Sequence, residues 1–138
     1  MTLIFLNEHL KLIRELEQVE AMLSSLRAHA ESTPQTLTGA PHGSGAHDKV
    51  GSLSAEIVDL DKRAGQLREK INRQQRSKVE PFVRSIRQDQ TRLIFRLRFV
   101  RGLSWRKVAE LVGGGNTKES IKSICYRYIK NLHRDDAP

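Results

Sequence analysis

The amino-acid sequence predicts an all-α protein, in which a long antiparallel helical hairpin is followed by a compact helix-turn-helix module. Three observations lead to this prediction. Apolar residues recur every three or four positions through most of the 138 residues. One stretch rich in Gly, Pro and Ser separates the two longest periodic segments. The last third of the chain holds shorter periodic segments, bounded by residues that are typical of helix ends.

The first predicted helix runs from Asn7 to Glu31, with Asn7 as its N-cap. Its apolar residues share one face because they are three or four positions apart. They are Leu6, Leu10, Ile13, Leu16, Val19, Leu23, Leu26 and Ala30. The opposite face mixes acidic and basic side chains, as a solvated helix surface does.

Residues 32–52, STPQTLTGAPHGSGAHDKVGS, interrupt this pattern with two prolines and four glycines. The composition predicts a flexible Gly/Ser-rich loop, and loops of this length tend to be functional or disordered. His42, His47 and Asp48 raise the alternative of a metal site. No Cys or second clustered His pair completes a ligand set, so we expect no metal and no cofactor.

A second long helix is predicted from Leu53 to about Arg76, which completes an N-terminal domain over residues 1–77. Its apolar residues repeat at spacings of four and three, which is a heptad pattern. They are Leu53, Ile57, Leu60, Ala64, Leu67 and Ile71. The two long helices either fold into an antiparallel hairpin or pair between chains as a homodimer. A two-helix hairpin by itself buries little apolar surface, which makes self-association credible.

The C-terminal domain is predicted over residues 78–138. Pro81 fits the first turn of a short helix, where its missing N–H is not needed. Phe82, Val83 and Ile86 on that helix are expected to cover the core of the module.

Three further helices are predicted between Gln90 and Leu132. Leu93, Leu97 and Val100 share one face of the first helix, which Gly102 ends in a left-handed conformation. Ser104 is the predicted N-cap of the second helix, residues 113–116 form a turn, and Thr117 caps the third helix. The inward residues of the second helix are Trp105, Val108, Ala109 and Val112. We expect Trp105 to pack the second helix onto the first.

The third helix of this module has one apolar face and one polar face at about 100° per residue. The apolar face consists of Ile121, Ile124, Cys125, Tyr128 and Leu132. The outward face consists of Glu119, Lys122, Ser123, Tyr126, Arg127 and Lys130. These outward side chains suit contacts with DNA phosphates and base edges, although an ordinary solvated helix face has a similar composition.

Charge is unevenly distributed along the chain. The net charge is +8, yet residues 1–77 carry 10 Lys and Arg against 10 Asp and Glu. Residues 78–138 carry 14 against 6, so the whole excess lies in the C-terminal domain. This segregation favours a nucleic-acid-binding module attached to a neutral scaffold.

Other classes of protein fit the sequence less well. Cys125, the one cysteine, excludes an internal disulfide, suits a reducing cytoplasm and is expected to serve packing. The N-terminal residues lack the features of a signal peptide, and no apolar run is long enough to span a membrane. We expect no enzyme and no catalytic residues, because the chain has neither a P-loop nor a nucleophile paired with a base at motif spacing.

The sequence resembles known families in one stretch and over its whole length. The stretch LRFVRGLSWRKVAELVGGGNTKESIKSICYRYIKNL resembles region 4 of sigma-70-family factors, which reads the promoter −35 element. The whole chain resembles phage and prophage proteins of the ArpU and RinA types, which are described as late transcription regulators. The motifs that carry this resemblance are PHGSG at 41–45, DKV at 48–50, IVDL at 57–60, LSW at 103–105 and GGGNT at 113–117.

The resemblance implies a sequence-specific regulator of transcription that binds double-stranded DNA in the cytoplasm of a bacterial host and contacts RNA polymerase. The expected DNA-binding residues are Arg106, Lys107, Asn116, Thr117, Lys118, Glu119, Lys122, Ser123, Tyr126, Arg127 and Lys130. The spacing departs from the usual motif, since Ile121 follows Ala109 by twelve positions rather than about ten. Two other functions remain open: a DNA-packaging factor resembling a small terminase subunit, and a helical adaptor that binds protein.

Overall fold

A computed structural model of the chain describes residues 1–32 and 45–135. Every regular element within these residues is a helix, which confirms the predicted all-α class. The chain groups into two compact units. We call Met1–Arg14 together with Lys70–Pro138 the head unit, and Glu15–Glu69 the arm unit.

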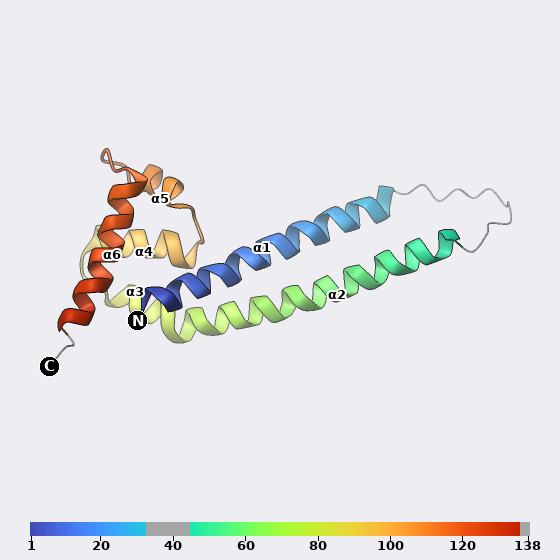
Figure 1. Cartoon of the computed structure of the whole chain (residues 1–138), viewed down its shortest axis with the longest axis horizontal. Coiled ribbons are helices and arrows are strands. Elements are labelled where there is room, and N and C mark those ends of the chain that lie inside the picture. Colours follow the sequence, from blue (N-terminus) through green and yellow to red (C-terminus); the bar gives the residue numbers. More distant parts are fainter. Residues whose placement is uncertain (33–44, 136–138) are drawn as a thin grey trace. The chain divides into compact units, whose positions relative to one another are not determined.

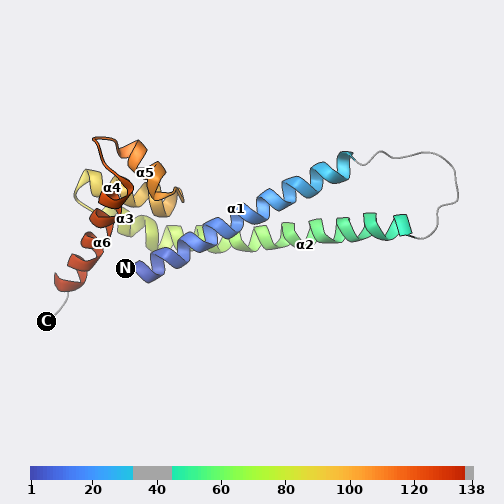
Figure 2. The same cartoon turned by 45° about the horizontal axis from the view of Figure 1, so that its top comes forward.

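The arm unit holds most of two long helices, α1 (Leu3–Ser32) and α2 (Gly45–Gln74). The two helices lie side by side with opposite chain directions in Figures 1 and 2. Their buried contacts in this unit come from Val19, Leu23, Ala64 and Leu67. Exposed ion pairs also join them: Glu15–Arg63, Glu20–Arg68 and Arg27–Asp61. Since exposed pairs contribute little, apolar burial holds the helices together.

Both long helices begin earlier than predicted. The Thr2 hydroxyl accepts a hydrogen bond from the Phe5 N–H at 3.1 Å and so supplies the helix cap, which makes the prediction of Asn7 as the N-cap wrong. Helix α2 begins at Gly45, so residues 45–52 of the predicted loop are helical. A glycine costs a helix only about 1 kcal/mol, which does not prevent this extension. Ser32, the first residue of the predicted loop, is the last residue of α1, and residues 33–44, including His42, lie outside the described residues.

Helix α2 continues through a π-helical turn, η1 (Gln75–Val79), into α3 (Glu80–Ser85). Pro81 lies in the first turn of α3, as predicted, but the preceding helix does not break there. Proline lacks an N–H and its ring crowds the carbonyl one turn earlier. The wider turn, in which the Glu80 N–H bonds to the Gln75 carbonyl, accommodates that ring.

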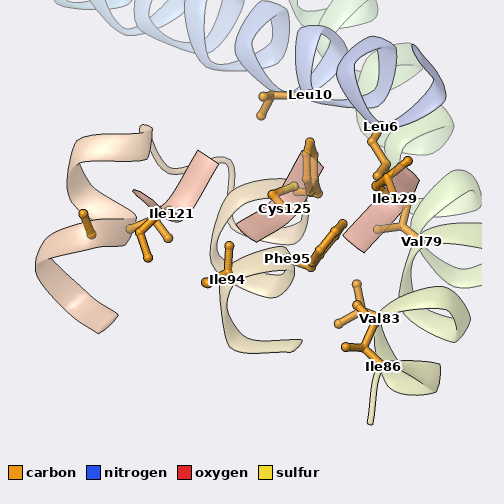
Figure 3. Close-up of a cluster of buried hydrophobic side chains, with 13 residues drawn as sticks. Leu6, Leu10, Val79, Val83, Ile86, Ile94, Phe95, Ile121, Cys125 and Ile129 are labelled. Atoms are coloured by element: carbon orange, nitrogen blue, oxygen red, sulfur yellow. The ribbon is translucent and has the colours of Figure 1, made fainter. Parts of the chain in front are cut away.

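The core of the head unit joins α1, η1, α3 and the four later helical segments into one apolar cluster (Figure 3). The later segments are α4 (Asp89–Phe95), η2 (Arg96–Val100), α5 (Trp105–Val112) and α6 (Lys118–Asp135). Leu6 and Leu10 of α1 are buried in this cluster, which explains why residues 1–14 group with the head unit. Phe82, Val83 and Ile86 also belong to it, as predicted.

The inward face of the segment formed by α4 and η2 was predicted one residue out of phase. Ile94, Phe95 and Phe99 are fully buried, whereas Leu93 is 42% exposed. Leu97 and Val100, which were also predicted to face inward, are half-buried. Ile94, Phe95, Arg98 and Phe99 are buried at spacings of three and four. The period is therefore that of an α-helix, and the prediction erred in its phase, which was set from Leu97 and Val100. Gly102 has a φ of 72°, which confirms the predicted left-handed end.

His9 of α1 is fully buried in the head unit. Its Nδ1 lies 2.8 Å from Gln74 Oε1. Because an amide oxygen only accepts, the Nδ1–H of His9 donates this hydrogen bond. Its Nε2 is buried without a hydrogen-bond partner. Burial lowers the pKa of His9 below 6.5, while the bond to Gln74 acts in the opposite direction.

We therefore expect the protein to lose stability as the pH falls below about 6.5. The unfolded chain takes up a proton on His9 near this pH, whereas the folded chain takes it up only at a lower pH. The stabilisation by neutral His9 is complete when the pH is above the pKa of His9 in the unfolded chain. It declines as the pH falls towards the lower pKa of His9 in the folded chain. The measurement is the free energy of unfolding in urea between about pH 8 and pH 5. The free energy of unfolding of the His9→Leu variant should change less with pH over this range, whereas the exposed control His133→Gln should behave as the unmodified protein does. An equal pH dependence in His9→Leu and the unmodified protein would contradict the assignment.

Candidate nucleic-acid interface

Helix α5 is fixed by its cap and by its buried face. The Ser104 hydroxyl accepts a hydrogen bond from the Lys107 N–H at 3.2 Å, as predicted for the N-cap. Val108 and Ala109 are buried in the head core. The side chains of Arg106 and Lys107 are exposed, and both lie within 4 Å of Glu110. Exposed pairs of this kind are weak, so both cations stay accessible to an anionic ligand.

The turn between α5 and α6 is built from glycine and asparagine. Gly113, Gly114 and Gly115 all have positive φ, which L side chains rarely adopt. The Gly113 N–H donates to the Ala109 carbonyl and ends α5. The Asn116 amide Nδ2 donates to the Gly113 carbonyl at 2.8 Å, so this predicted DNA-binding side chain is engaged in the turn.

Helix α6 begins with a reciprocal cap. The Ser120 N–H donates to Thr117 Oγ1 at 3.2 Å, and the Thr117 N–H donates to Ser120 Oγ at 2.9 Å. The two hydroxyls satisfy backbone donors as the Ser and Glu of a capping box do. The predicted cap at Thr117 is thus confirmed.

We expect Thr117→Ala to lower the free energy of unfolding by about 1 kcal/mol, because the Ser120 N–H loses its acceptor. Thr117→Ser should retain most of the stability, since it keeps the hydroxyl. Ser123→Ala, an exposed position on the same helix, should change stability by less than about 0.5 kcal/mol. Urea unfolding monitored by circular dichroism compares the three variants. A Thr117→Ala variant as stable as Ser123→Ala would show that the cap is unimportant.

The two faces of α6 follow the predicted division. Ile121 and Cys125 are fully buried, and Ile124, Tyr128 and Leu132 are half-buried. Ile129, which was left out of the predicted apolar face, is also buried, and its spacing of four from Cys125 was the available signal. All six predicted outward residues are exposed: Glu119, Lys122, Ser123, Tyr126, Arg127 and Lys130. The exposed face therefore holds cations, hydroxyls and a carboxylate within three turns of helix.

Six of the eleven predicted site residues line two surface depressions. Arg106, Asn116, Thr117, Lys118 and Glu119 line one surface depression between α5 and the start of α6. Further along α6, Arg127 lines a second depression, whose other wall is the start of α4. Lys122, Ser123, Tyr126 and Lys130 lie on the exposed face of α6 and line neither depression.

Trp105 of α5 makes aromatic contacts both with the preceding helix and with the exposed face of α6. The ring of Trp105 lies edge-on to Phe99 at 6.3 Å, which confirms the predicted packing of α5 against the preceding helix. The same ring is 6.2 Å from that of Tyr126. Arg98 lies over Trp105, with its Cζ 4.4 Å from the ring centroid. Sequence reasoning missed Arg98, although its spacing of three and four from Phe95 and Ile94 placed it on the buried face.

Charge distinguishes the two units. The head unit contains 19 Lys and Arg and 7 Asp and Glu, a net charge of +12. The arm unit contains 5 Lys and Arg and 9 Asp and Glu, a net charge of −4. The outward face of α6 thus belongs to a strongly basic unit, which attracts polyanions.

Other chemistries find little support in the described residues. Burial raises the pKa of the Cys125 thiol to about 12, so this cysteine is protonated and acts in packing. Among the side chains described, those of residues 1–32 and 51–135, no group of His, Cys, Asp and Glu is arranged to hold a metal ion. The side chains of His47 and Asp48 lie outside the described part. No helix in the described part of the chain has the length and apolarity needed to cross a bilayer.

Comparison with known protein families, curated proteins and solved structures finds no match. The geometry and charge of the site are therefore the basis for assigning a function.

Proposed function

We propose that this protein is a sequence-specific regulator of transcription that binds double-stranded DNA, with α5 and α6 as a helix-turn-helix and α6 as the recognition helix. The observation that carries the proposal is the outward face of α6. An apolar side anchored by Ile121 and Cys125 leaves a polar, cationic side exposed on a helix of 18 residues. A helix of this kind fits the major groove of B-DNA, which is about 12 Å wide.

The exposed side chains divide by chemistry. Lys122, Arg127 and Lys130, with Arg106 and Lys107 on α5, are assigned to phosphate contacts, which supply most of the affinity. Glu119, Ser123 and Tyr126 are assigned to base edges because they donate or accept hydrogen bonds without being simple cations. Asn116, Thr117 and Lys118 form the end of the turn and the start of α6, where the protein approaches the phosphate backbone. Asn116 and Thr117 fix the local backbone, and Lys118 adds a positive charge.

The resemblance to phage late regulators extends this proposal to the cellular setting. It implies action in the cytoplasm of a bacterial host and contact with RNA polymerase, as region 4 of sigma factors makes. In this setting the protein is a regulator and not an enzyme.

The arm unit favours an additional role in protein association. An apolar surface groove is lined by Ala21, Met22, Leu26 and Leu60, with the carboxylates of Glu56 and Asp59 in its wall. The net charge of −4 makes this unit a poor surface for DNA. A homodimer through the arm, or an adaptor function, would use such a surface.

Selection of duplexes from a randomised pool, followed by affinity measurements at several salt concentrations, tests the proposal. We expect an enriched sequence, and a linear fall of log affinity with log salt. Failure to bind any duplex at low salt would overturn it in favour of the adaptor. Light scattering separates the remaining alternative, since a ring of many subunits would favour DNA packaging and a monomer or dimer would favour transcription.

A further inference from the structure

Arg98, on the π-helical turn η2, is an unusual side chain because it is almost entirely buried, with 7% of its surface exposed. Its Nη1 donates to the Leu103 carbonyl at 2.8 Å, and its Nε is buried without a hydrogen-bond partner. Burial lowers the pKa of Arg98, but a guanidinium stays protonated in proteins. The protein thus places a permanent positive charge inside the head unit.

Packing by itself does not explain a buried guanidinium. Removing a charge from water is costly, and an apolar side chain of similar volume would fill the same space at less cost. A guanidinium has a property that an apolar side chain lacks: it is planar and attracts the face of an aromatic ring. The Trp105 ring occupies that position, with its centroid 4.4 Å from Arg98 Cζ.

Trp105 links this buried charge to the exposed face of α6. The rings of Trp105 and Tyr126 meet at an interplanar angle of 85° with centroids 6.2 Å apart, which is the preferred edge-to-face geometry. Tyr126 is 39% exposed, so one side of its ring rests on Trp105 while the residue still reaches the surface. The three residues thus form a continuous series of contacts from the interior to the surface.

We propose that Arg98 is a positioning residue that fixes the plane of Trp105, and that Trp105 in turn holds the Tyr126 hydroxyl in the direction of the base edges. The proposal rests on the DNA-binding function proposed above for α6. Arg98 itself is buried and contacts no phosphate. Its loss should therefore weaken discrimination between DNA sequences and leave the salt dependence of binding unchanged.

The first test uses the full-length protein without DNA. Trp105 is the single tryptophan of the chain, so its fluorescence and near-ultraviolet circular dichroism report on its contacts with Arg98 and Tyr126. Arg98→Met keeps a long apolar stem and removes the cation, and should shift the Trp105 emission and weaken the dichroism. Arg98→Lys keeps the charge without the plane and should give an intermediate signal. Arg87→Met, which removes an exposed arginine from the same unit, is the matched control and should change neither signal.

The second test measures the ratio of affinities for a duplex enriched from a randomised pool and for a duplex of mixed sequence. Arg98→Met should reduce this ratio about fivefold to tenfold, as expected for one misaligned hydrogen bond, with the salt slope unchanged. Tyr126→Phe keeps the ring on Trp105 and removes the hydroxyl, and should reduce the ratio by a similar factor. Combining both substitutions should cause no further loss, because the two residues act on one contact.

The outcomes separate this inference from the proposed function. A protein that binds no duplex overturns both. Two results overturn the inference and leave DNA binding intact. One is an affinity ratio that Arg98→Met does not change, and the other is an additive loss of this ratio in the double variant. If circular dichroism shows that Arg98→Met is unfolded, Arg98→Lys decides: a reduced ratio at an unchanged salt slope supports the positioning role, and an unchanged ratio overturns it.

Discussion

Replacing both Lys122 and Arg127 by Ala is expected to flatten the slope of log DNA affinity against log salt by about two units. Both side chains are exposed on the outward face of α6. Each phosphate contact releases roughly one condensed counterion from DNA, so two lost contacts remove about two counterions. Affinity at moderate salt should fall by about tenfold per lost contact, because hydrogen bonds to charged groups are among the stronger ones.

The matched control removes two positive charges from the arm unit. Lys62→Ala combined with Arg68→Ala changes the net charge of the protein by the same amount, and both side chains are exposed on α2. Its salt slope should stay within about half a unit of that of the unmodified protein. Equal flattening in both double variants would mean that overall charge, and not the outer face of α6, determines binding.

Replacing Phe95 by Ala is expected to lower the free energy of unfolding by about 3–5 kcal/mol. Phe95 is fully buried, and its ring centroid lies 5.5–5.7 Å from those of Phe82, Phe99 and Tyr128. Truncation leaves a cavity among three aromatic rings that come from α3, η2 and α6. Since small domains are stable by only about 5–15 kcal/mol, this change should leave the head unit close to unfolding at 25 °C.

Leu93→Ala is the matched control for this cavity. Leu93 lies two residues earlier on α4 but is 42% exposed, so its truncation should cost much less, about 1 kcal/mol or below. Urea unfolding of both variants and the unmodified protein provides the comparison. A larger loss at Leu93 than at Phe95 would contradict the helical phase in the structure and support the phase expected from the sequence.

In the C-terminal domain, features that depend on neighbouring residues were predicted well. Ser104 and Thr117 were identified as caps because a hydroxyl before an apolar run satisfies backbone donors two or three residues later. Gly102 was identified as a left-handed helix end for a similarly local reason. The exposed set on α6 followed from its regular 3.6-residue repeat, which continues undisturbed over the whole helix.

Features that depend on distant residues or irregular turns were not predicted. The π-helical turns η1 and η2 were not anticipated. Leu93 was placed inward because the phase was set from Leu97 and Val100, whereas the buried face follows Ile94, Phe95 and Phe99. Arg98 was not recognised as buried because its two partners are brought to it only by the fold. These partners are the Trp105 ring, which lies under the guanidinium, and the Leu103 carbonyl, which accepts a hydrogen bond from it. The grouping of Leu6 and Leu10 with residues after Lys70 is likewise a tertiary effect.

The glycine turn between α5 and α6 has a consequence for sequence variation. No atom lies within 4 Å of a Cβ built at Gly113, so bulk does not exclude a side chain there. Its φ of 69° and ψ of −153° fall in a region that essentially only glycine occupies. Alanine and leucine at this position would thus have the same backbone torsional strain despite their different volumes. Asparagine, which tolerates other left-handed sites, would be strained here as well.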